Sequence, residues 1–185
     1  MTAPEPTAGS ASAPSAVRPI VVLVGPPGSG KTSVGGVLAR LTGSRLRDTD
    51  QDIEAAAGRP IPDIFVTDGE PAFRAMERDA VAAALVEHDG VLSLGGGSVL
   101  AEPTRALLKQ HTVVFLSVTM PTGVRRTGLA TNRPLLTGVN PRATYKALLD
   151  ARLHLYQEVA TLVVPTDEMT IEQVATVIVE ELHLS

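Results

Sequence analysis

Short apolar runs alternate with longer segments of helical periodicity along most of this chain. In the longer segments, apolar residues recur every three or four positions, a spacing that places them on one face of a helix. Strands that alternate with helices pair as a parallel sheet, so the pattern predicts an α/β fold with helices on both faces of the sheet. The predicted strands lie near residues 19–24, 45–48, 91–94, 112–117 and 161–165.

Several of the helical segments carry their own start and stop signals. Pro71 occupies the first turn of a long predicted helix, where its missing N–H does no harm. Thr170 and Gln173 have the spacing of a capping box at the start of the last helix. The predicted helices are 33–41, two short ones within 51–68 that are broken at 58–60, 70–87, one near 121–127, 141–160 and one that begins near 170.

The amino-terminal segment differs in composition from the rest of the chain. Residues 1–17 are rich in Ala, Pro, Ser and Thr, and Glu5 is their only charged side chain. They have neither the basic start nor the apolar centre of a signal peptide. We therefore expect a disordered tail over 1–17, followed by a single domain over 18–185 that is long enough to bury a sizeable core.

The overall composition is that of an ordinary soluble protein. Hydrophobic residues make up 44%, charged residues 19%, and the net charge is −4. This balance gives no sign of a nucleic-acid partner, and no apolar run approaches the length of a membrane span. The chain has no cysteine, which fits a reducing compartment and a cytoplasmic location.

Residues 25–32 carry the clearest chemical signal in the chain. They read Gly-Pro-Pro-Gly-Ser-Gly-Lys-Thr, which satisfies G-x-x-x-x-G-K-[ST], and they stand between a predicted strand and a predicted helix. That context is typical of a phosphate-binding P-loop. Glycines let the backbone N–H groups approach a phosphate chain, and the helix N-terminus adds partial positive charge. Lys31 is then expected at the β- and γ-phosphates, and the Thr32 hydroxyl at a magnesium ion.

Asp48 and Asp50 follow the second predicted strand, at the edge of the sheet where the P-loop also ends. Two residues apart in extended backbone, their side chains are expected on the same side. One carboxylate would support Mg²⁺ through water, and the other would accept a proton from a substrate hydroxyl. The alternative is that either aspartate caps the next helix. The spacing leaves both interpretations open.

Three glycines and four arginines complete the candidates. Gly95, Gly96 and Gly97 follow the third predicted strand, which indicates either a ligand close to the backbone or a tight turn. Residues 128–138 have glycines at both ends and an internal proline, so they are expected to form a mobile lid. The arginines that either contact an anion or are merely solvated or salt-bridged are Arg74, Arg126, Arg133 and Arg152.

The motifs together resemble those of the shikimate kinase family, of the bacterial and notably actinobacterial kind. The resemblance extends from about Val17 to the C-terminus. It implies a P-loop kinase fold with three layers, in which helices flank a five-stranded parallel sheet of order 2-3-1-4-5. The segments that carry it are GPPGSGKTS at 25–33, DTD at 48–50, DIFVTDGEPAFR at 63–74, LSLGGG at 92–97 and NRPLL at 132–136.

The resemblance also implies an activity. Members of the family transfer the γ-phosphate of ATP to the 3-hydroxyl of shikimate, in the pathway to chorismate and the aromatic amino acids. It implies Mg²⁺ as cofactor, shikimate and ATP as the small-molecule partners, and a monomer. By resemblance, Lys31, Asp50 and Arg133 are catalytic, and Thr32 and Asp48 hold the metal.

The remaining roles are carried over in the same way. Arg74 and Arg152 resemble the two arginines that clamp the shikimate carboxylate, and Arg126 resembles one that stacks on adenine. The implied substrate-binding residues are Asp50, Phe65, Phe73, Arg74, Gly96, Gly97 and Arg152. The implied ATP-binding residues are Gly28, Ser29, Gly30, Lys31, Thr32, Ser33, Arg126 and Arg133.

One segment departs from the family pattern, and two other functions compete. Residues 165–170 lack the basic and proline residues expected on the far side of adenine. A gluconate kinase or a nucleotide kinase of the same fold is one alternative, although the DTD, GGG and NRPLL motifs together argue against it. A nucleotide-binding regulator without kinase activity is the other, and it would have been free to lose Lys31, Asp50 and Arg133.

Overall fold

A five-stranded parallel sheet forms the centre of the computed structural model, which describes residues 17–127 and 140–184. The strand order is β2-β3-β1-β4-β5, as expected. The strands are β1 (Val21–Val24), β2 (Leu46–Asp48), β3 (Val91–Ser93), β4 (Val113–Ser117) and β5 (Leu162–Pro165). The helices are α1 (Lys31–Leu41), α2 (Thr49–Ala57), α3 (Ile61–Thr67), α4 (Glu70–Glu87), η1 (Ser98–Leu100), α5 (Glu102–Leu108), α6 (Met120–Thr127), α7 (Pro141–Val159) and α8 (Ile171–Glu181).

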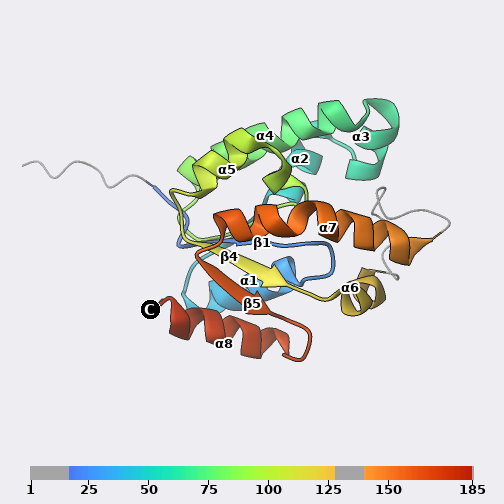
Figure 1. The fold of residues 1–185 in the computed structure, drawn as a ribbon. Helices are drawn as coiled ribbons and strands as arrows, with labels where there is room; N and C mark the ends of the chain where they lie inside the picture. Colours follow the sequence, from blue (N-terminus) through green and yellow to red (C-terminus); the bar gives the residue numbers. More distant parts are fainter. Residues whose placement is uncertain (1–16, 128–139, 185) are drawn as a thin grey trace, which may run out of the picture.

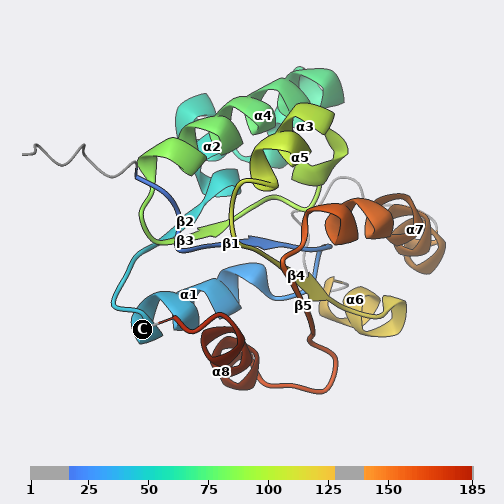
Figure 2. The same cartoon turned by 60° about the vertical axis from the view of Figure 1, so that its left-hand side comes forward.

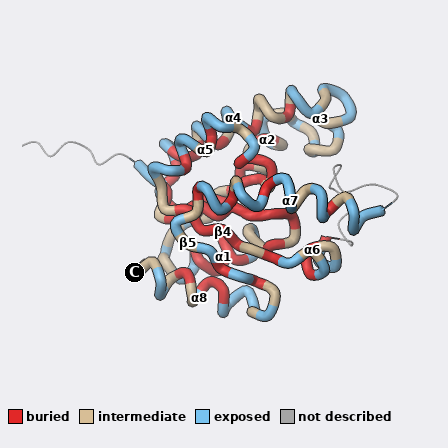
Figure 3. The backbone as a smooth tube through the Cα atoms, in the orientation of Figure 1, coloured by how far each residue is buried: buried red, intermediate tan, exposed pale blue. Residues whose placement is uncertain are grey.

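Helices cover both faces of the sheet (Figures 1 and 2). Alternate residues of a strand point to opposite faces, so Leu23 and Val22 of β1 belong to different apolar layers. The layer around Leu23 includes residues of α1 and α8, and the layer around Val22 includes residues of α4, α5 and α7. The buried positions follow the strands through the middle of the molecule (Figure 3).

A smaller apolar cluster joins α2 and α3 to the amino-terminal part of α4. Its buried members are Ile53, Ile64 and Phe73, and the ring of Phe65 lies 4.6 Å from that of Phe73, centroid to centroid. This cluster is separate from the two layers on the sheet. It holds α2, α3 and the start of α4 together beyond the carboxyl end of β2, where the candidate site is expected.

Most predicted elements are confirmed, and the differences are at element ends and in two short helices. The long helix has the predicted bounds, Glu70–Glu87, and the capping box of Thr170 and Gln173 is present. β1 begins at Val21 rather than residue 19. The short helices η1 and α5 have no counterpart among the predictions.

Two predictions fall wholly or almost wholly outside the described residues. The tail over 1–17 is described only at Val17, and the lid over 128–138, with Arg133, is not described at all. Within 17–127 and 140–184, no helix combines the length and apolar character needed to cross a membrane.

Candidate functional site

The P-loop connects β1 to α1 and has the backbone shape that its glycines permit. Gly28 and Gly30 have φ values of 80° and 92°, in the left-handed region that other residues rarely adopt. Gly30 immediately precedes the first turn of α1, so the loop ends at a helix N-terminus. The ammonium of Lys31 lies over this loop, and its Nζ donates to the carbonyl oxygens of Gly25 at 2.8 Å and Pro26 at 3.2 Å.

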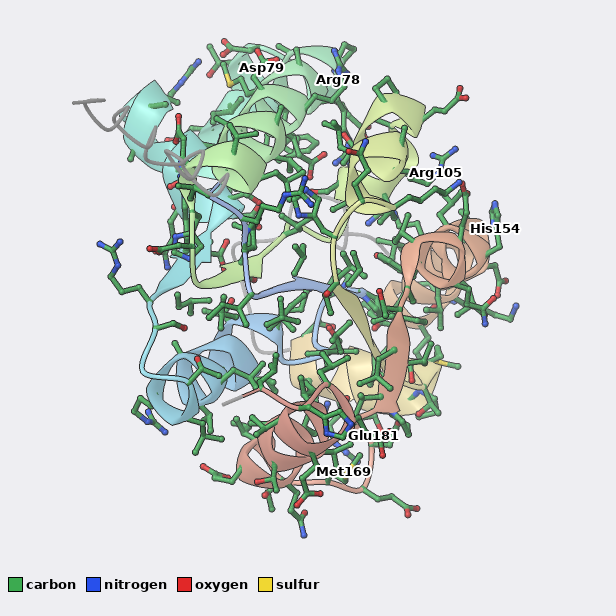
Figure 4. All side chains as sticks on the ribbon, turned by 90° about the vertical axis from the view of Figure 1, so that its left-hand side faces the viewer. Arg78, Asp79, Arg105, His154, Met169 and Glu181 are labelled. Carbon is green, nitrogen blue, oxygen red and sulfur yellow. The ribbon has the colours of Figure 1, made fainter. Side chains whose placement is uncertain are left out.

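A cavity of about 570 Å³ lies on one side of the P-loop. Residues 28–34 form one wall, and Arg126, Thr166 and the start of α8 form the other. The guanidinium of Arg126 donates to the Thr166 carbonyl at 2.7 Å and to its hydroxyl at 3.0 Å. Met169, which Figure 4 shows beside α8, also lines this cavity. The segment that departs from the family pattern thus supplies this wall with Thr166, Met169 and Thr170.

Arg126 also bridges this wall to the P-loop. Its Nη1 lies 3.3 Å from the carbonyl oxygen of Gly28. α6, which carries Arg126, lies beside the P-loop, and a Cβ on Gly28 would approach the Gly123 carbonyl and the Thr127 methyl within 3.1 Å. Glycine at 28 is therefore required both by its φ and by this close packing.

Thr32, Asp48 and Asp50 meet on the other side of the P-loop. The Thr32 hydroxyl donates to Asp48 Oδ2 at 2.9 Å, and Asp48 Oδ1 accepts from the backbone N–H of Asp50 at 3.0 Å. Asp48 is therefore both the N-cap of α2 and a partner of the P-loop threonine, so the two sequence interpretations do not exclude each other. A hydroxyl beside a carboxylate is a set of hard oxygen donors that suits Mg²⁺.

Asp48 and Asp50 lie together as predicted, but the alternation of side chains along a strand is not what brings them together. Asp50 does not lie in extended backbone, because α2 begins at Thr49. It stands instead in the first turn of the helix, where the positive end of the helix dipole stabilises a carboxylate. Both aspartates line the same cavity of about 360 Å³.

The buried wall of this second cavity is built around the side chain of Arg74. Its Nη1 donates to Glu77 at 2.6 Å and its Nη2 to Glu70 at 3.0 Å. Burial alone would lower the pKa of the Arg74 guanidinium, but the adjacent Glu77 and Glu70 carboxylates outweigh that effect and raise it. Glu77, itself only 4% exposed, also accepts from the Ser98 hydroxyl at 3.2 Å. Glu77 is buried and Arg74 half-buried, unlike Arg78 and Asp79, which extend from α4 into solvent (Figure 4).

Two of the three glycines after β3 make room for charged side chains of this cavity. A Cβ on Gly95 would lie 2.5 Å from Asp50 Oδ1 and 2.9 Å from Glu77 Oε1, and a Cβ on Gly97 would overlap the guanidinium of Arg74. Gly97 has φ −95° and ψ −6°, which other residues also adopt. Close packing against the site's own side chains, rather than an unusual backbone, therefore favours glycine at 95 and 97, since a larger residue would displace those side chains.

α7 supplies the opposite wall. Arg152 is buried, lines the same cavity, and its Nη1 donates to the Gly96 carbonyl at 3.1 Å. Two tyrosines on the same helix also donate to backbone carbonyls, Tyr145 to Pro27 at 2.8 Å and Tyr156 to Gly96 at 2.5 Å.

The sequence prediction included most of the residues that the structure brings to the two cavities. Gly28, Ser29, Gly30, Lys31, Thr32, Ser33 and Arg126 line the first cavity, and Thr32, Asp48, Asp50, Phe65, Phe73, Arg74, Gly96, Gly97 and Arg152 line the second. Arg133 lies outside the described residues. Functional residues that the prediction did not include are Glu77 and Thr166, which line the cavities, and Ser98, Tyr145 and Tyr156, which donate hydrogen bonds to residues of their walls. Other lining residues, among them Gln51 and Glu54, were also not predicted. The signal for the tyrosines was available, since they are the chain's only two and stand three helical turns apart.

Comparison with known proteins identifies one family. A family model described as shikimate kinase matches residues 27–183. A curated protein named shikimate kinase, from Saccharopolyspora erythraea, is 63% identical over 166 residues, which cover 90% of this chain and 95% of that protein.

Solved structures agree with this assignment. A shikimate kinase from Acinetobacter baumannii, solved in complex with shikimate, superposes with a TM-score of 0.87 at 36% identity, and the match covers 90% of this chain and 93% of that one. A gluconokinase from Sinorhizobium meliloti superposes with a TM-score of 0.55 at 21% identity, covering 91% of this chain and 93% of that one. That weaker likeness shows a common fold and nothing about the substrate.

Proposed function

The chain belongs to the shikimate kinase family, and on that premise we propose that its two cavities hold ATP and shikimate on either side of the P-loop threonine. The reaction is the transfer of the γ-phosphate of ATP to the 3-hydroxyl of shikimate, which yields ADP and shikimate 3-phosphate. The observation that carries the assignment is that Thr32 lines both cavities. A nucleotide on the P-loop would then present its last phosphate to a hydroxyl in the second cavity.

Shikimate is a small carboxylate with three hydroxyl groups, and the second cavity offers a partner for each part. Arg74 of α4 and Arg152 of α7 both bring guanidinium groups to the cavity, and guanidinium groups bind a carboxylate with matched geometry. The backbone of Gly96 and Gly97 lies beside them, and Phe65 and Phe73 supply an apolar wall for the ring. Asp50 is the acceptor for the hydroxyls and the base for the one that attacks.

ATP is assigned to the first cavity. The backbone N–H groups of the P-loop and the ammonium of Lys31 suit the phosphate chain, as at other helix N-termini that bind phosphate. Phosphoryl transfer needs positioning and charge neutralisation more than covalent help. Lys31 and Arg133 are proposed to neutralise the charge that develops on the transferring group, and Arg126 to lie against the adenine. The proposed ATP-binding residues remain Gly28, Ser29, Gly30, Lys31, Thr32, Ser33, Arg126 and Arg133.

Thr32 and Asp48 are the proposed magnesium residues. Among the described residues, no group of three or more His, Cys, Asp or Glu side chains could hold a metal alone. This fits a magnesium ion that takes only one or two ligands from the protein and the rest from phosphates and water. When bound, the ion would neutralise phosphate charge.

We expect Asp48→Asn to raise the Mg²⁺ concentration needed for half-maximal activity by about tenfold or more, as for other residues that support a metal indirectly. Asparagine is as good a helix cap as aspartate, so α2 should remain folded. A magnesium titration of initial rates measures the shift. Asp52→Asn is the control, since Asp52 pairs with Arg47 at 2.7 Å outside the cavity. An unchanged magnesium requirement in Asp48→Asn would remove this residue from the metal site.

We expect Gly97→Ala to raise the KM for shikimate by about tenfold or more, the scale of a lost hydrogen bond to a charged group. The added methyl group would displace the guanidinium of Arg74, which can move because it ends a flexible side chain. Steady-state kinetics at saturating ATP measures the effect. Gly36→Ala is the matched control, since a Cβ there meets no atom within 4 Å. If Gly97→Ala keeps the wild-type KM, Arg74 is not needed where the structure has it.

The function itself is tested by coupled ADP release with ATP and Mg²⁺. We expect strong stimulation by shikimate and none by gluconate or without an acceptor. Stimulation by gluconate alone would mean that the protein is a kinase of this fold with gluconate rather than shikimate as its substrate. ATP binding without acceptor-dependent turnover would support the regulator instead. A monomeric state and a cytoplasmic location are proposed from the sequence and the family resemblance alone.

A further inference from the structure

The chain's only two tyrosines both point their hydroxyls at loops of the two cavities. Tyr145 is 1% exposed and donates to the Pro27 carbonyl in the P-loop at 2.8 Å. Tyr156 is 0% exposed and donates to the Gly96 carbonyl, in the turn that follows β3, at 2.5 Å. Both come from α7, so one helix reaches the nucleotide-side loop and the substrate-side turn.

The helical register places these donors on one face. Tyr145 and Arg152 are two turns apart, and Arg152 and Tyr156 one turn, so all three face the sheet side of α7. All three are buried. The ring of Tyr145 packs directly against Gly123 of α6, where a Cβ would overlap the ring. The ring of Tyr156 stacks on Phe115 of β4, with 5.0 Å between centroids.

A donor that holds a carbonyl also sets the direction of the next N–H. The peptide group is planar and trans, so its C=O and N–H point in opposite directions. Tyr145 therefore sets the direction of the Gly28 N–H, and Gly28 is a residue of the first cavity. Tyr156, together with Arg152, sets the direction of the Gly97 N–H, and Gly97 is a residue of the second cavity.

The Tyr156 hydroxyl is suited to this task because its burial keeps it protonated. Burial raises the pKa of the Tyr156 phenol to about 12, so its proton stays available for donation. Within the described part of the chain, the Gly96 carbonyl accepts from two side chains, and the loss of the phenol would leave Arg152 as the remaining donor. Because that arginine is also the proposed partner of the substrate carboxylate, the phenol is needed to hold the turn when the arginine is engaged.

We propose that Tyr145 and Tyr156 are positioning residues with separate duties, Tyr145 aiming the Gly28 N–H at the nucleotide phosphates and Tyr156 aiming the Gly97 N–H at the substrate. α7 is thereby a common support for the two binding loops. This inference rests on the proposed function for the identity of the ligands, but not for the hydrogen bonds themselves.

The test compares Tyr145→Phe with Tyr156→Phe, which keep the rings and remove only the hydroxyls. In Tyr145→Phe the KM for ATP should rise about three- to tenfold, the scale of one net hydrogen bond, with the KM for shikimate within about twofold of wild type. In Tyr156→Phe the KM for shikimate should rise by the same factor, and the KM for ATP should remain within about twofold of the wild-type value. Each variant is the matched control for the other, since both remove a buried phenol from one helix.

Amide spectra of the ligand-free proteins give a readout that does not depend on activity. In ¹⁵N–¹H correlation spectra, Tyr145→Phe should shift the Gly28 cross-peak more than that of Gly97, and Tyr156→Phe the reverse. If the wild type shows no shikimate-dependent turnover, the proposed function fails, and these spectra still decide the proposal on α7. The proposal is overturned if neither glycine peak moves, or if both variants change both KM values together, as a general loosening of α7 would.

Discussion

Replacing Lys31 with methionine should lower kcat by about 10³-fold or more, the scale of losing a charged group that faces a transferring phosphoryl. The ammonium projects over the P-loop, where its Nζ already contacts two loop carbonyls, and methionine replaces the unbranched stem of the side chain but lacks the terminal ammonium. Single-turnover rates at saturating ATP and shikimate would measure the loss at the chemical step.

The chain offers a matched control for this charge. Lys146 lies on α7 with an exposed side chain and pairs with Asp150 at 2.5 Å, so Lys146→Met should leave kcat unchanged. The contradictory result would be a Lys31→Met enzyme that keeps wild-type kcat and changes only the KM for ATP. The lysine would then bind the ground state and transition state equally and would not be catalytic.

Replacing Asp50 with asparagine should lower kcat by about 10²- to 10⁴-fold, the range for losing a general base. Asparagine has nearly the same shape and still binds hydroxyls, so the KM for shikimate should change much less than kcat. The N–H of Asp50 would still donate to Asp48, so α2 should keep its start. Steady-state kinetics against shikimate, with a melting curve for each protein, separates these effects.

Asp52→Asn serves again as the control, because it removes a carboxylate two residues away that lies outside the cavity of Asp50. A wild-type kcat in Asp50→Asn would mean that the attacking hydroxyl needs no base from this residue.

The elements were predictable because the signals that specify them are local. The spacing of Phe73, Val81 and Leu85 predicts one buried face of α4, and Pro71 marks its first turn. The P-loop was equally predictable, since its glycines, Lys31 and Thr32 are adjacent in sequence and need only the preceding strand and following helix. Element ends were less certain, as at β1, because hydrogen bonds between neighbouring strands decide where a strand begins.

Several residues were correctly predicted to lie at the site, but the contacts that place them there were not predictable from the sequence. Asp48 and Asp50 do line one cavity, but through a cap and a helix turn rather than through strand alternation. Gly95 and Gly97 do lie at the cavity, but they are required by the space that Asp50, Glu77 and Arg74 occupy. The sequence shows that residues 95 and 97 are glycines, but it does not show which side chains pack against them.

The sequence by itself determined the fold class, the P-loop, the approximate positions of most helices and the family, since each depends on periodicity or on motifs within short segments. Only the tertiary structure decided how Arg74 packs against the buried Glu77, and why Tyr145 and Tyr156 stand where they do. The tyrosine hydroxyls reach carbonyls 118 and 60 residues away along the chain. Contacts of that separation depend on how α7 packs against the sheet, which no local pattern specifies.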